Sequence, residues 1–454
     1  MKIIIVGCGK VGRSLAATLN EEGYDVTVVD QNREKVIAIT NKYDIMGVIG
    51  NGATRETQLE AGIDSADLLI AVTGSDELNL LCCVMAKKKG NCHTVARVKN
   101  PVYAADAPYL RDELGLNMVI NPEHAAAKEI GRILNFPTAI SVETFAKGRV
   151  ELLTFKLPEG SPLAGISVKD AVSRYKSKNK ILFCAVERGE EAHIPNGDFV
   201  FGEKDLISII ASPKNALDFF EKIHYKIQPV KNAIAVGGEN ITHYLCEALM
   251  GSGIGLTVVE SDEKICEELS VRYEGIKVIK ADPSDKDTLI EEGLSRADAF
   301  VSLTSQDEEN ILLSLFASDA GARKVVTKIS KPEYDGIIRK LDLDSIVYPA
   351  NITTNMIIRY IRAMSNTLGS NMEALYNIVR GKIVAAQFTV SDSSPIAGVP
   401  LSSLRFKSGV LIAAILRGRS LIIPMGDAVI NPRDSVVVVS KEHSLFDVSD
   451  VLAK

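Results

Sequence analysis

The sequence predicts an α/β protein with two Rossmann-like, doubly wound parallel sheets, each followed by a small α+β domain. Three observations support this prediction. The 454 residues are about three times the length of a typical domain, the two halves repeat each other, and each half changes its strand pattern part-way along. We therefore expect two to four domains, and a single small domain is excluded.

An internal repeat defines the organisation of the chain. The segment Thr73-Gly-Ser-Asp-Glu-Leu-Asn79 recurs 231 residues later as Thr304-Ser-Gln-Asp-Glu-Glu-Asn310. The later part of each half recurs as well, because Ser161-Pro-Leu-Ala-Gly165 matches Ser394-Pro-Ile-Ala-Gly398. Each half is therefore bipartite. The expected domains are two large ones at 1–136 and 229–368 and two small ones at 137–228 and 369–454.

Apolar, β-branched runs separated by helix-length segments predict the parallel sheets. Continuous runs of this kind are typical of strands that helices cover on both faces. The later segments 150–210 and 385–440 instead contain short alternating strands interrupted by Pro and Gly, which predicts mostly antiparallel α+β domains. In the first half the expected parallel strands are Lys2–Val6, Asp25–Val29, Ile45–Ile49, Leu68–Val72 and Thr94–Val98.

Composition excludes several classes of protein. Hydrophobic residues at 46% and charged residues at 24% are globular averages, and a net charge of −6 gives no electrostatic reason to bind nucleic acid. The longest apolar runs, such as 409–416, are too short to span a bilayer, and no signal peptide is visible. The seven cysteines contain no CxxC and are interpreted as reduced core thiols of a cytoplasmic protein, with a metal cluster at 82–93 as the weaker alternative.

The strongest functional signal is a dinucleotide-binding fingerprint directly after the first strand. Gly7-Cys-Gly-Lys-Val-Gly12 opens a helix, and Asp30 ends the second strand. The glycines permit a tight turn, close approach to a diphosphate and close helix packing, while the helix N-terminus favours phosphate charge. Asp30 would accept hydrogen bonds from ribose hydroxyls and repel a 2′-phosphate, which favours NAD(H), ATP or ADP over NADP, although Arg33 lies nearby. The alternative is a tight turn that binds nothing.

Three further segments follow strand ends, at the edge where ligands bind in open parallel sheets. Asn51-Gly52 can approach an adenine, and Thr73-Gly74 can line a cofactor with backbone groups. Arg97 could hold a terminal phosphate with two hydrogen bonds. For Asp76-Glu77 and Asn79 two interpretations stay open, a binding role or an N-cap of the following helix.

The second half keeps the strand pattern but changes the fingerprint. In Gly237-Gly-Glu-Asn-Ile-Thr242, Glu239 and Thr242 stand where the last two glycines are expected, while Glu260 still ends the second strand. A carboxylate beside a diphosphate is unfavourable because like charges repel. We therefore expect a second site that is weakened or that holds its nucleotide differently.

No catalytic constellation is recognisable. The six histidines show no paired spacing, GxxxxGK[ST] is absent, and no Cys or Lys lies in a recognisable nucleophile context. A nucleotide pocket without catalytic groups suits a ligand sensor. The alternatives are a nicotinamide-dependent oxidoreductase and a nucleotide-binding scaffold without a membrane partner.

The quoted motifs, together with Ala96-Arg-Val98, resemble those of the TrkA family of Trk potassium-uptake regulatory proteins, which are built of tandem RCK (KTN) domains. The resemblance covers essentially the whole chain in the order N1, C1, N2, C2. It implies a non-enzymatic ring of RCK domains, peripheral on the inner face of the cell membrane, that binds NAD(H) and ATP or ADP. It also implies a membrane potassium-translocating partner of the TrkH or TrkG type, whose ion flux the ring gates.

A helix-length segment closes each large domain and bears on assembly. Pro122–Ile133 and Pro349–Tyr360 carry an Ala- or Ile-rich face suited to packing on another RCK domain, so we expect a dimer or tetramer. The alternative is that these faces pack within one chain.

The sequence predicts no catalytic residue and no metal ligand. The candidate nucleotide contacts are Gly7, Cys8, Gly9, Lys10, Val11, Gly12, Asp30, Asn51, Gly52, Thr73, Gly74 and Arg97 in the first half, and Gly237, Gly238 and Glu260 in the second.

Overall fold

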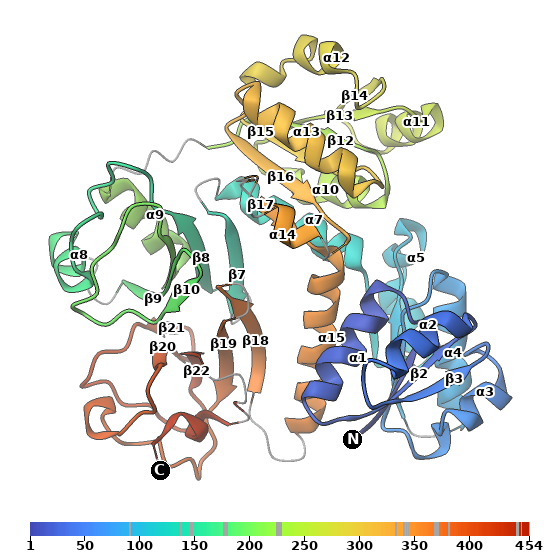
Figure 1. Cartoon of the computed structure of the whole chain (residues 1–454), viewed down its shortest axis with the longest axis horizontal. Coiled ribbons are helices and arrows are strands. Elements are labelled where there is room, and N and C mark those ends of the chain that lie inside the picture. Colours follow the sequence, from blue (N-terminus) through green and yellow to red (C-terminus); the bar gives the residue numbers. More distant parts are fainter. Residues whose placement is uncertain are drawn as a thin grey trace. The chain divides into compact units, whose positions relative to one another are not determined.

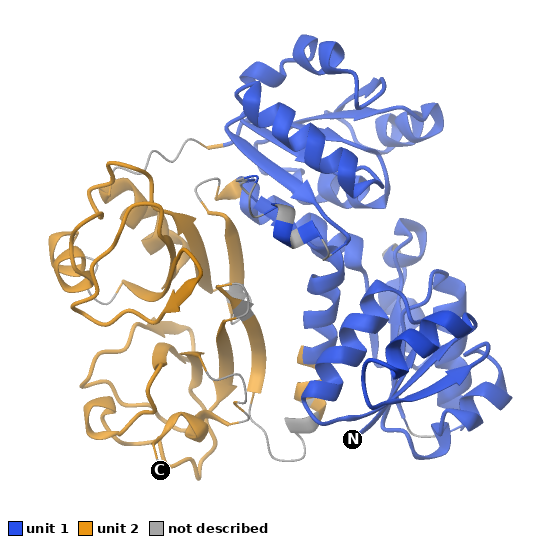
Figure 2. Cartoon of the chain, viewed as in Figure 1, with its two compact units in different colours: residues 1–134, 230–358 blue, residues 135–229, 359–454 orange. Residues whose placement is uncertain are grey.

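The computed structural model contains two six-stranded parallel sheets and two five-stranded antiparallel sheets, which confirms the predicted fold class (Figure 1). The chain divides into two compact units, residues 1–134 with 230–358 and residues 135–229 with 359–454 (Figure 2). Each unit therefore combines corresponding domains from both halves of the sequence.

The structure describes residues 1–89, 92–136, 139–145, 149–175, 180–223, 229–331, 334–338, 341, 343, 345–366, 372–379, 382–441, 445 and 447–453. Residues 137, 228, 368 and 369, at the expected domain boundaries, lie outside this part, so those boundaries stay predictions.

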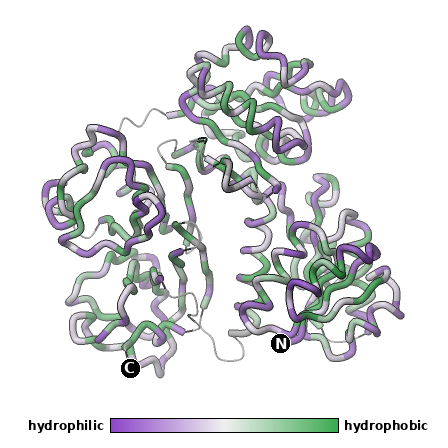
Figure 3. Tube along the Cα trace, in the orientation of Figure 1, coloured by the Kyte–Doolittle hydropathy of each residue, from purple (hydrophilic) through white to green (hydrophobic). Residues whose placement is uncertain are grey.

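The first large sheet has the strand order β3-β2-β1-β4-β5-β6, and all its pairings are parallel. Strand order reverses between β1 and β4, which is the point where ligands bind in doubly wound sheets. Figure 3 shows hydrophobic residues along these strands, as expected for a sheet buried on both faces. The strands are β1 (Lys2–Val6), β2 (Asp25–Asp30), β3 (Met46–Ile49), β4 (Leu68–Ala71), β5 (His93–Arg97) and β6 (Met118–Ile120).

Helices connect these strands, and several begin at side-chain caps. The Asn32 side chain accepts a hydrogen bond from the Lys35 amide, and Thr54 accepts one from the Thr57 amide, so the helices after β2 and β3 start at fixed positions. One face of the sheet packs on α4 through Cys82, among other residues. The helices are α1 (Lys10–Glu21), α2 (Arg33–Thr40), α3 (Arg55–Glu60), α4 (Asp76–Lys89), α5 (Pro101–Ala105) and α6 (Ala107–Glu113).

The second large sheet repeats this topology in the order β14-β13-β12-β15-β16-β17. Its strands are β12 (Asn232–Val236), β13 (Gly255–Glu260), β14 (Lys277–Lys280), β15 (Ala299–Ser302), β16 (Lys324–Lys328) and β17 (Ser345–Val347). Its helices are α10 (Asn240–Leu249), α11 (Glu263–Arg272), α12 (Lys286–Glu291), α13 (Asp307–Asp319) and α14 (Asp335–Ile338).

The helix α7 (Pro122–Asn135) leaves the first large domain and packs on the second one. Its residues Ala126, Ala127 and Ile130 belong to the same buried core as Tyr244 and Leu245 of α10. The apolar face of α7 is therefore covered within the chain. This agrees with the alternative in the sequence analysis, in which these faces pack within one chain. The corresponding helix of the second half is α15 (Pro349–Asn366).

The small domains form two antiparallel sheets that share a core. Phe145 and Val150 of the first sheet lie in one buried cluster with Tyr376 and Ile383 of the second. The first domain has the strand order β10-β9-β11-β8-β7, and the second has β18-β19-β22-β20-β21. The elements are β7 (Ser141–Phe145), β8 (Val150–Lys156), α8 (Val168–Arg174), β9 (Ile181–Arg188), β10 (Glu191–His193), β11 (Leu206–Ala211), α9 (Pro213–Lys222), β18 (Met372–Ile378), β19 (Ile383–Thr389), β20 (Val410–Arg417), β21 (Ser420–Ile422) and β22 (Ser435–Ser440).

An ion pair between a half-exposed arginine and a buried aspartate recurs in both small domains. In the first, Arg188 donates to the Asp205 carboxylate at 2.7 Å and to the Val200 carbonyl at 2.8 Å. In the second, Arg417 donates to Asp434 at 2.8 Å, and the Asp434 side chain is only 4% exposed. Each arginine therefore links the carboxylate to the segment that precedes the last strand of its sheet.

Two further features concern sequence expectations. All seven cysteines are free and buried, and burial raises the pKa of Cys82 to about 12. Within the part of the chain that the structure describes, no group of three or more His, Cys, Asp or Glu residues is placed to hold a metal ion. The described helices include none with both the length and the apolar character needed to cross a membrane.

Candidate functional site

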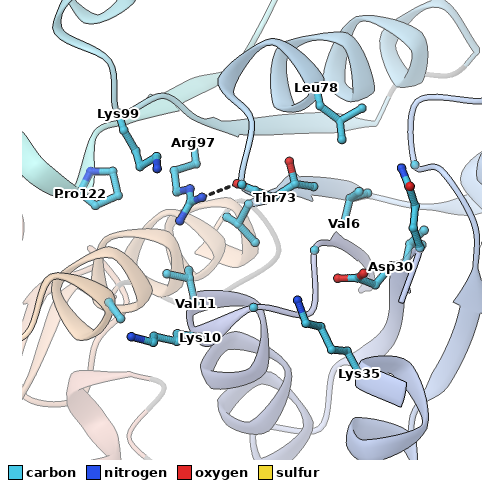
Figure 4. A pocket seen from close by; sticks show the side chains of 18 of the residues that line it. Val6, Lys10, Val11, Asp30, Lys35, Thr73, Leu78, Arg97, Lys99 and Pro122 are labelled. Atoms are coloured by element: carbon cyan, nitrogen blue, oxygen red, sulfur yellow. Dashed lines mark hydrogen bonds between the residues drawn. The ribbon is translucent and has the colours of Figure 1, made fainter. Parts of the chain in front are cut away.

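A cavity of about 630 Å³ opens at the carboxyl ends of β1, β2, β4 and β5, where the strand order of the first sheet reverses (Figure 4). This volume lies within the range of small-molecule sites in proteins. Nine of the twelve residues predicted for the first half line this cavity. They are Gly7, Gly9, Lys10, Val11, Asp30, Gly52, Thr73, Gly74 and Arg97.

The fingerprint turn has the close contacts that only glycine permits. Gly7 has a φ of +107°, and a Cβ atom there would lie 2.9 Å from the backbone nitrogen of Thr73. A Cβ on Gly12 would lie 1.8 Å from the carbonyl oxygen of Gly7, so α1 starts in contact with the turn. By contrast, a Cβ on Gly9 would meet no atom within 4 Å, because this residue faces the open cavity. Gly12 therefore serves packing and does not line the cavity.

The start of α1 faces the cavity without a capping side chain. Gly9 is the N-cap residue and provides no side-chain hydrogen bond. The positive end of the helix dipole and the first-turn amides are therefore directed at the region where the fingerprint predicts a diphosphate.

The Asp30 carboxylate is fixed by two backbone amides. Its Oδ2 atom accepts from the Cys8 amide at 2.7 Å, and Oδ1 accepts from the Asn32 amide at 2.8 Å. Each oxygen keeps a second lone pair for a ligand hydroxyl. Cys8 does not line the cavity and instead anchors Asp30. Lys35, which the sequence analysis did not select, lies in the cavity beside Asp30, whereas Arg33 is exposed elsewhere (Figure 4).

Asn51 is the third predicted residue that the structure does not bring into the cavity. Its side chain accepts a hydrogen bond from the Ala53 amide at 3.0 Å, which closes a local turn after β3. Gly50 and Gly52 line the cavity in its place.

Arg97 presents a partly buried guanidinium at the far side of the cavity. One terminal nitrogen donates to the Thr73 carbonyl, and Nε is buried without a hydrogen-bond partner among the described residues (Figure 4). Burial lowers the pKa of Arg97, although Asp76 and Glu123 oppose this effect. Because an unpaired buried donor is unfavourable, this geometry favours an anionic ligand.

Asp76 and Asn79 hold the loops that carry Thr73 and Arg97. The fully buried Asn79 accepts from the Thr73 amide at 2.8 Å and donates to the Arg97 carbonyl at 2.9 Å. Asp76 accepts from the amide of Lys99 at 2.9 Å. Both therefore position the site and neither is an N-cap.

The N-cap interpretation applies instead to Ser75. Its hydroxyl accepts from the Leu78 amide at 3.1 Å at the start of α4. Glu77 accepts hydrogen bonds from Ser75 and from Tyr103, and these bonds lower the pKa of Glu77.

The cavity is completed by residues from the second half of the chain. Ser330, Pro349 and Ala350 line it together with Pro122 and Glu123, so the first turns of α7 and α15 both reach this region. Sequence reasoning did not select these residues for the site, because none lies near the fingerprint along the chain. The only available signal was the proline that begins both helices.

Two contacts join the halves beside the cavity. Tyr244 of α10 donates to the carbonyl of Lys99 at 3.1 Å and accepts from the Asn121 side chain at 2.7 Å. Burial raises the pKa of Glu123, while the charges of Lys328 and Lys99 lower it.

The predicted residues of the second half do not line this cavity. Glu260 accepts hydrogen bonds from the amides of Gly238 and Asp262, as Asp30 does in the first half. Gly237 keeps a positive φ of 95°, and its carbonyl accepts from the Thr242 hydroxyl. The second turn thus keeps its first glycine and its carboxylate anchor but has an internal contact that the first turn lacks.

Comparison with known proteins identifies the family. A family model described as the TrkA-N domain matches residues 3–122 and 233–349, and one described as the TrkA-C domain matches residues 152–224 and 385–452. The chain belongs to the TrkA family. A Trk system potassium uptake protein TrkA homolog from Methanosarcina mazei is 31% identical and covers 99% of each chain. TrkA of Vibrio alginolyticus is 29% identical over 100% of this chain and 98% of its own.

Solved structures show the same fold. A GsuK channel aligns with a TM-score of 0.64 at 17% identity, over 97% of this chain and 76% of the other. A GsuK channel bound to NAD aligns with a TM-score of 0.62 at the same identity and coverage. At 17% identity this similarity shows a shared fold only.

Proposed function

We propose that this TrkA-family chain is a cytoplasmic nucleotide-sensing regulatory subunit of a Trk-type potassium uptake system. It binds NAD(H) and ATP or ADP in the first-half cavity and gates a membrane potassium-translocating subunit of the TrkH or TrkG type. The observation that carries this proposal is the partly buried Arg97 guanidinium, with an unpaired Nε, in a cavity that begins at a glycine fingerprint. The names of the full-length relatives support the link to potassium uptake.

The cavity suits a nucleotide in one orientation. The ribose lies at Asp30, the first phosphates lie at the start of α1, and the terminal phosphate reaches Arg97 and Lys99. Cations outnumber carboxylates around the cavity, which complements a polyphosphate. The charged lining residues are Lys10, Lys35, Arg97 and Lys99 against Asp30 and Glu123.

We propose a regulatory and not a catalytic role, in keeping with the names of the full-length relatives. The far end of the cavity is built from both halves, including Pro349 and Ala350. A ligand that contacts both large domains binds one arrangement of them better than another and so shifts their populations. We propose that a peripheral ring of two or four chains passes this shift to the membrane partner.

Titration of the full-length chain with NADH, ATP and ADP tests the binding step. We expect saturable binding to the wild type, weaker binding to Arg97→Gln, and no change in Arg55→Gln, which removes an exposed arginine of the same domain. No binding to the folded wild type would contradict the proposal. A substrate-dependent loss of NADH absorbance would support the oxidoreductase alternative instead.

Flux measurements test the regulatory step. The chain is co-purified with its multi-span membrane partner, and potassium flux is measured in vesicles with and without nucleotide. We expect a nucleotide response that Arg97→Gln loses. A folded chain that binds nucleotide but retains no membrane protein would identify a scaffold without this partner.

A further inference from the structure

The two large domains carry equivalent cations at equivalent strand ends. Lys328 ends β16 as Arg97 ends β5, and the two residues are 231 positions apart. Lys328 Nζ donates to the Leu303 carbonyl at 3.2 Å, and its side chain is only 7% exposed. A buried ammonium of this kind requires a counter-charge.

A counter-charge for Lys328 comes from the altered fingerprint, in addition to the charge of Glu123. A carboxylate oxygen of Glu239 lies 3.7 Å from Lys328 Nζ. Glu239 is the N-cap residue of α10 but caps no amide with its side chain, so the carboxylate is directed at Lys328. In the first half the same position is Gly9, whose missing side chain leaves open cavity, and the buried Nε of Arg97 has no partner among the described residues.

Thr242 closes the second turn in the same region. Its hydroxyl donates to the Gly237 carbonyl. In the first half even a Cβ at the equivalent Gly12 would lie 1.8 Å from the Gly7 carbonyl oxygen. The second turn has therefore opened enough to seat a threonine, and its carbonyl is already bonded.

We propose that the second half carries its own anion, with the Glu239 carboxylate taking the place that a nucleotide phosphate takes in the first half. One chain then binds one nucleoside di- or triphosphate, in the first cavity. This inference rests on the proposed function of that cavity. The second large domain contributes Ser330, Pro349 and Ala350 to the first site without binding a nucleotide of its own.

Calorimetric titration of the full-length chain with ATP counts the sites. We expect one site in the wild type and two in Glu239→Gly/Thr242→Gly, which restores the glycine fingerprint. The control Glu274→Gly removes an exposed glutamate from the same domain and should keep one site. Adding Arg97→Gln to the opened variant should weaken one of its two sites and spare the other.

The outcomes separate this inference from the proposed function. Two sites in the wild type, or one site in the folded opened variant, would overturn the inference while leaving the first site intact. A folded wild type that binds no ATP would refute the proposed function. The inference would then be judged by whether the opened variant gains a site.

A second measurement covers the case in which the opened variant does not fold. Glu239→Gln is expected to lower the thermal midpoint of the wild type, because it removes the carboxylate that lies 3.7 Å from Lys328 Nζ. In a Lys328→Met background the same substitution should cause no loss. Equal losses in both backgrounds would show that the two side chains do not interact, and would overturn the inference.

Discussion

Arg97→Gln perturbs the group on which the proposed nucleotide binding depends most directly. Arg97 ends β5 and Asp30 ends β2, and the strand order places β1 and β4 between them. Three strand spacings of about 4.8 Å put the two side chains roughly 14 Å apart along the sheet edge. A ribose at Asp30 with a single phosphate at α1 does not reach that far, whereas a triphosphate does.

The expected loss follows from the hydrogen bonds that Arg97 can offer. A hydrogen bond to a charged group contributes about 1.5–3 kcal/mol, so losing one lowers ATP affinity by about 10- to 150-fold. AMP affinity should change little, because its phosphate stays at the fingerprint turn. Titration calorimetry with ATP, ADP and AMP at one ionic strength measures both effects, with Arg55→Gln as the control.

Two results would refute this reasoning. Equal losses for ATP and AMP would show that Arg97 acts on the fold of the site and not on a distal phosphate. Unchanged ATP affinity would show that the buried Nε has no anion to bind. Circular dichroism of the unliganded variant separates the first result from partial unfolding.

Three further predictions concern other groups. Asp30→Ala should weaken NADH and ATP binding by about 1.5–3 kcal/mol, and unchanged titration curves would contradict the ribose assignment. Burial raises the pKa of Glu123, so the ionised carboxylate opposes folding. Glu123→Gln should therefore raise the thermal midpoint of the unliganded chain at pH 7. This gain should vanish as the pH falls below the pKa of an unfolded glutamate, about 4.3. Arg417→Gln leaves the buried Asp434 carboxylate without its half-exposed cation and should cost about 1–3 kcal/mol in urea unfolding. The exposed pair of Arg433 should cost about 0–1 kcal/mol when broken by Arg433→Gln, and equal costs for the two arginines would contradict the argument.

Features encoded in continuous sequence could be predicted. The strands and the glycine fingerprint depend on patterns within a few residues, and the repeat depends on direct matches between continuous segments. The structure places Gly7, Gly9 and Asp30 around one cavity. Asn51 was misplaced because an Asx turn captures its side chain, which a strand-end argument does not consider. Lys35 was missed because its approach to Asp30 depends on how α2 starts.

The positioning roles of Asp76 and Asn79 had a signal that was not used. The same Asp and Asn recur at Asp307 and Asn310, and Asn310 donates to the Lys328 carbonyl at 3.1 Å as Asn79 donates to that of Arg97. An N-cap uses only a side-chain acceptor, whereas an Asn amide also donates, so a recurring Asn suits a bridge between two loops. The cavity-lining residues of the second half, in contrast, could not be predicted, because their approach to the first sheet depends on how the two large domains pack together.

The packing of α7 on the second large domain explains why the two halves must be studied together. The apolar face of α7 belongs to the core of the second large domain, so cutting the chain after residue 228 would expose Ala127 and Ile130 and leave that core incomplete. Separate expression of the two halves would therefore confuse loss of binding with loss of folding. The first turns of α7 and α15 also bring Glu123 and Pro349 to one cavity, although these residues lie 226 positions apart in the sequence. A ligand there contacts both large domains at once, which is the physical requirement for a nucleotide to change their relationship.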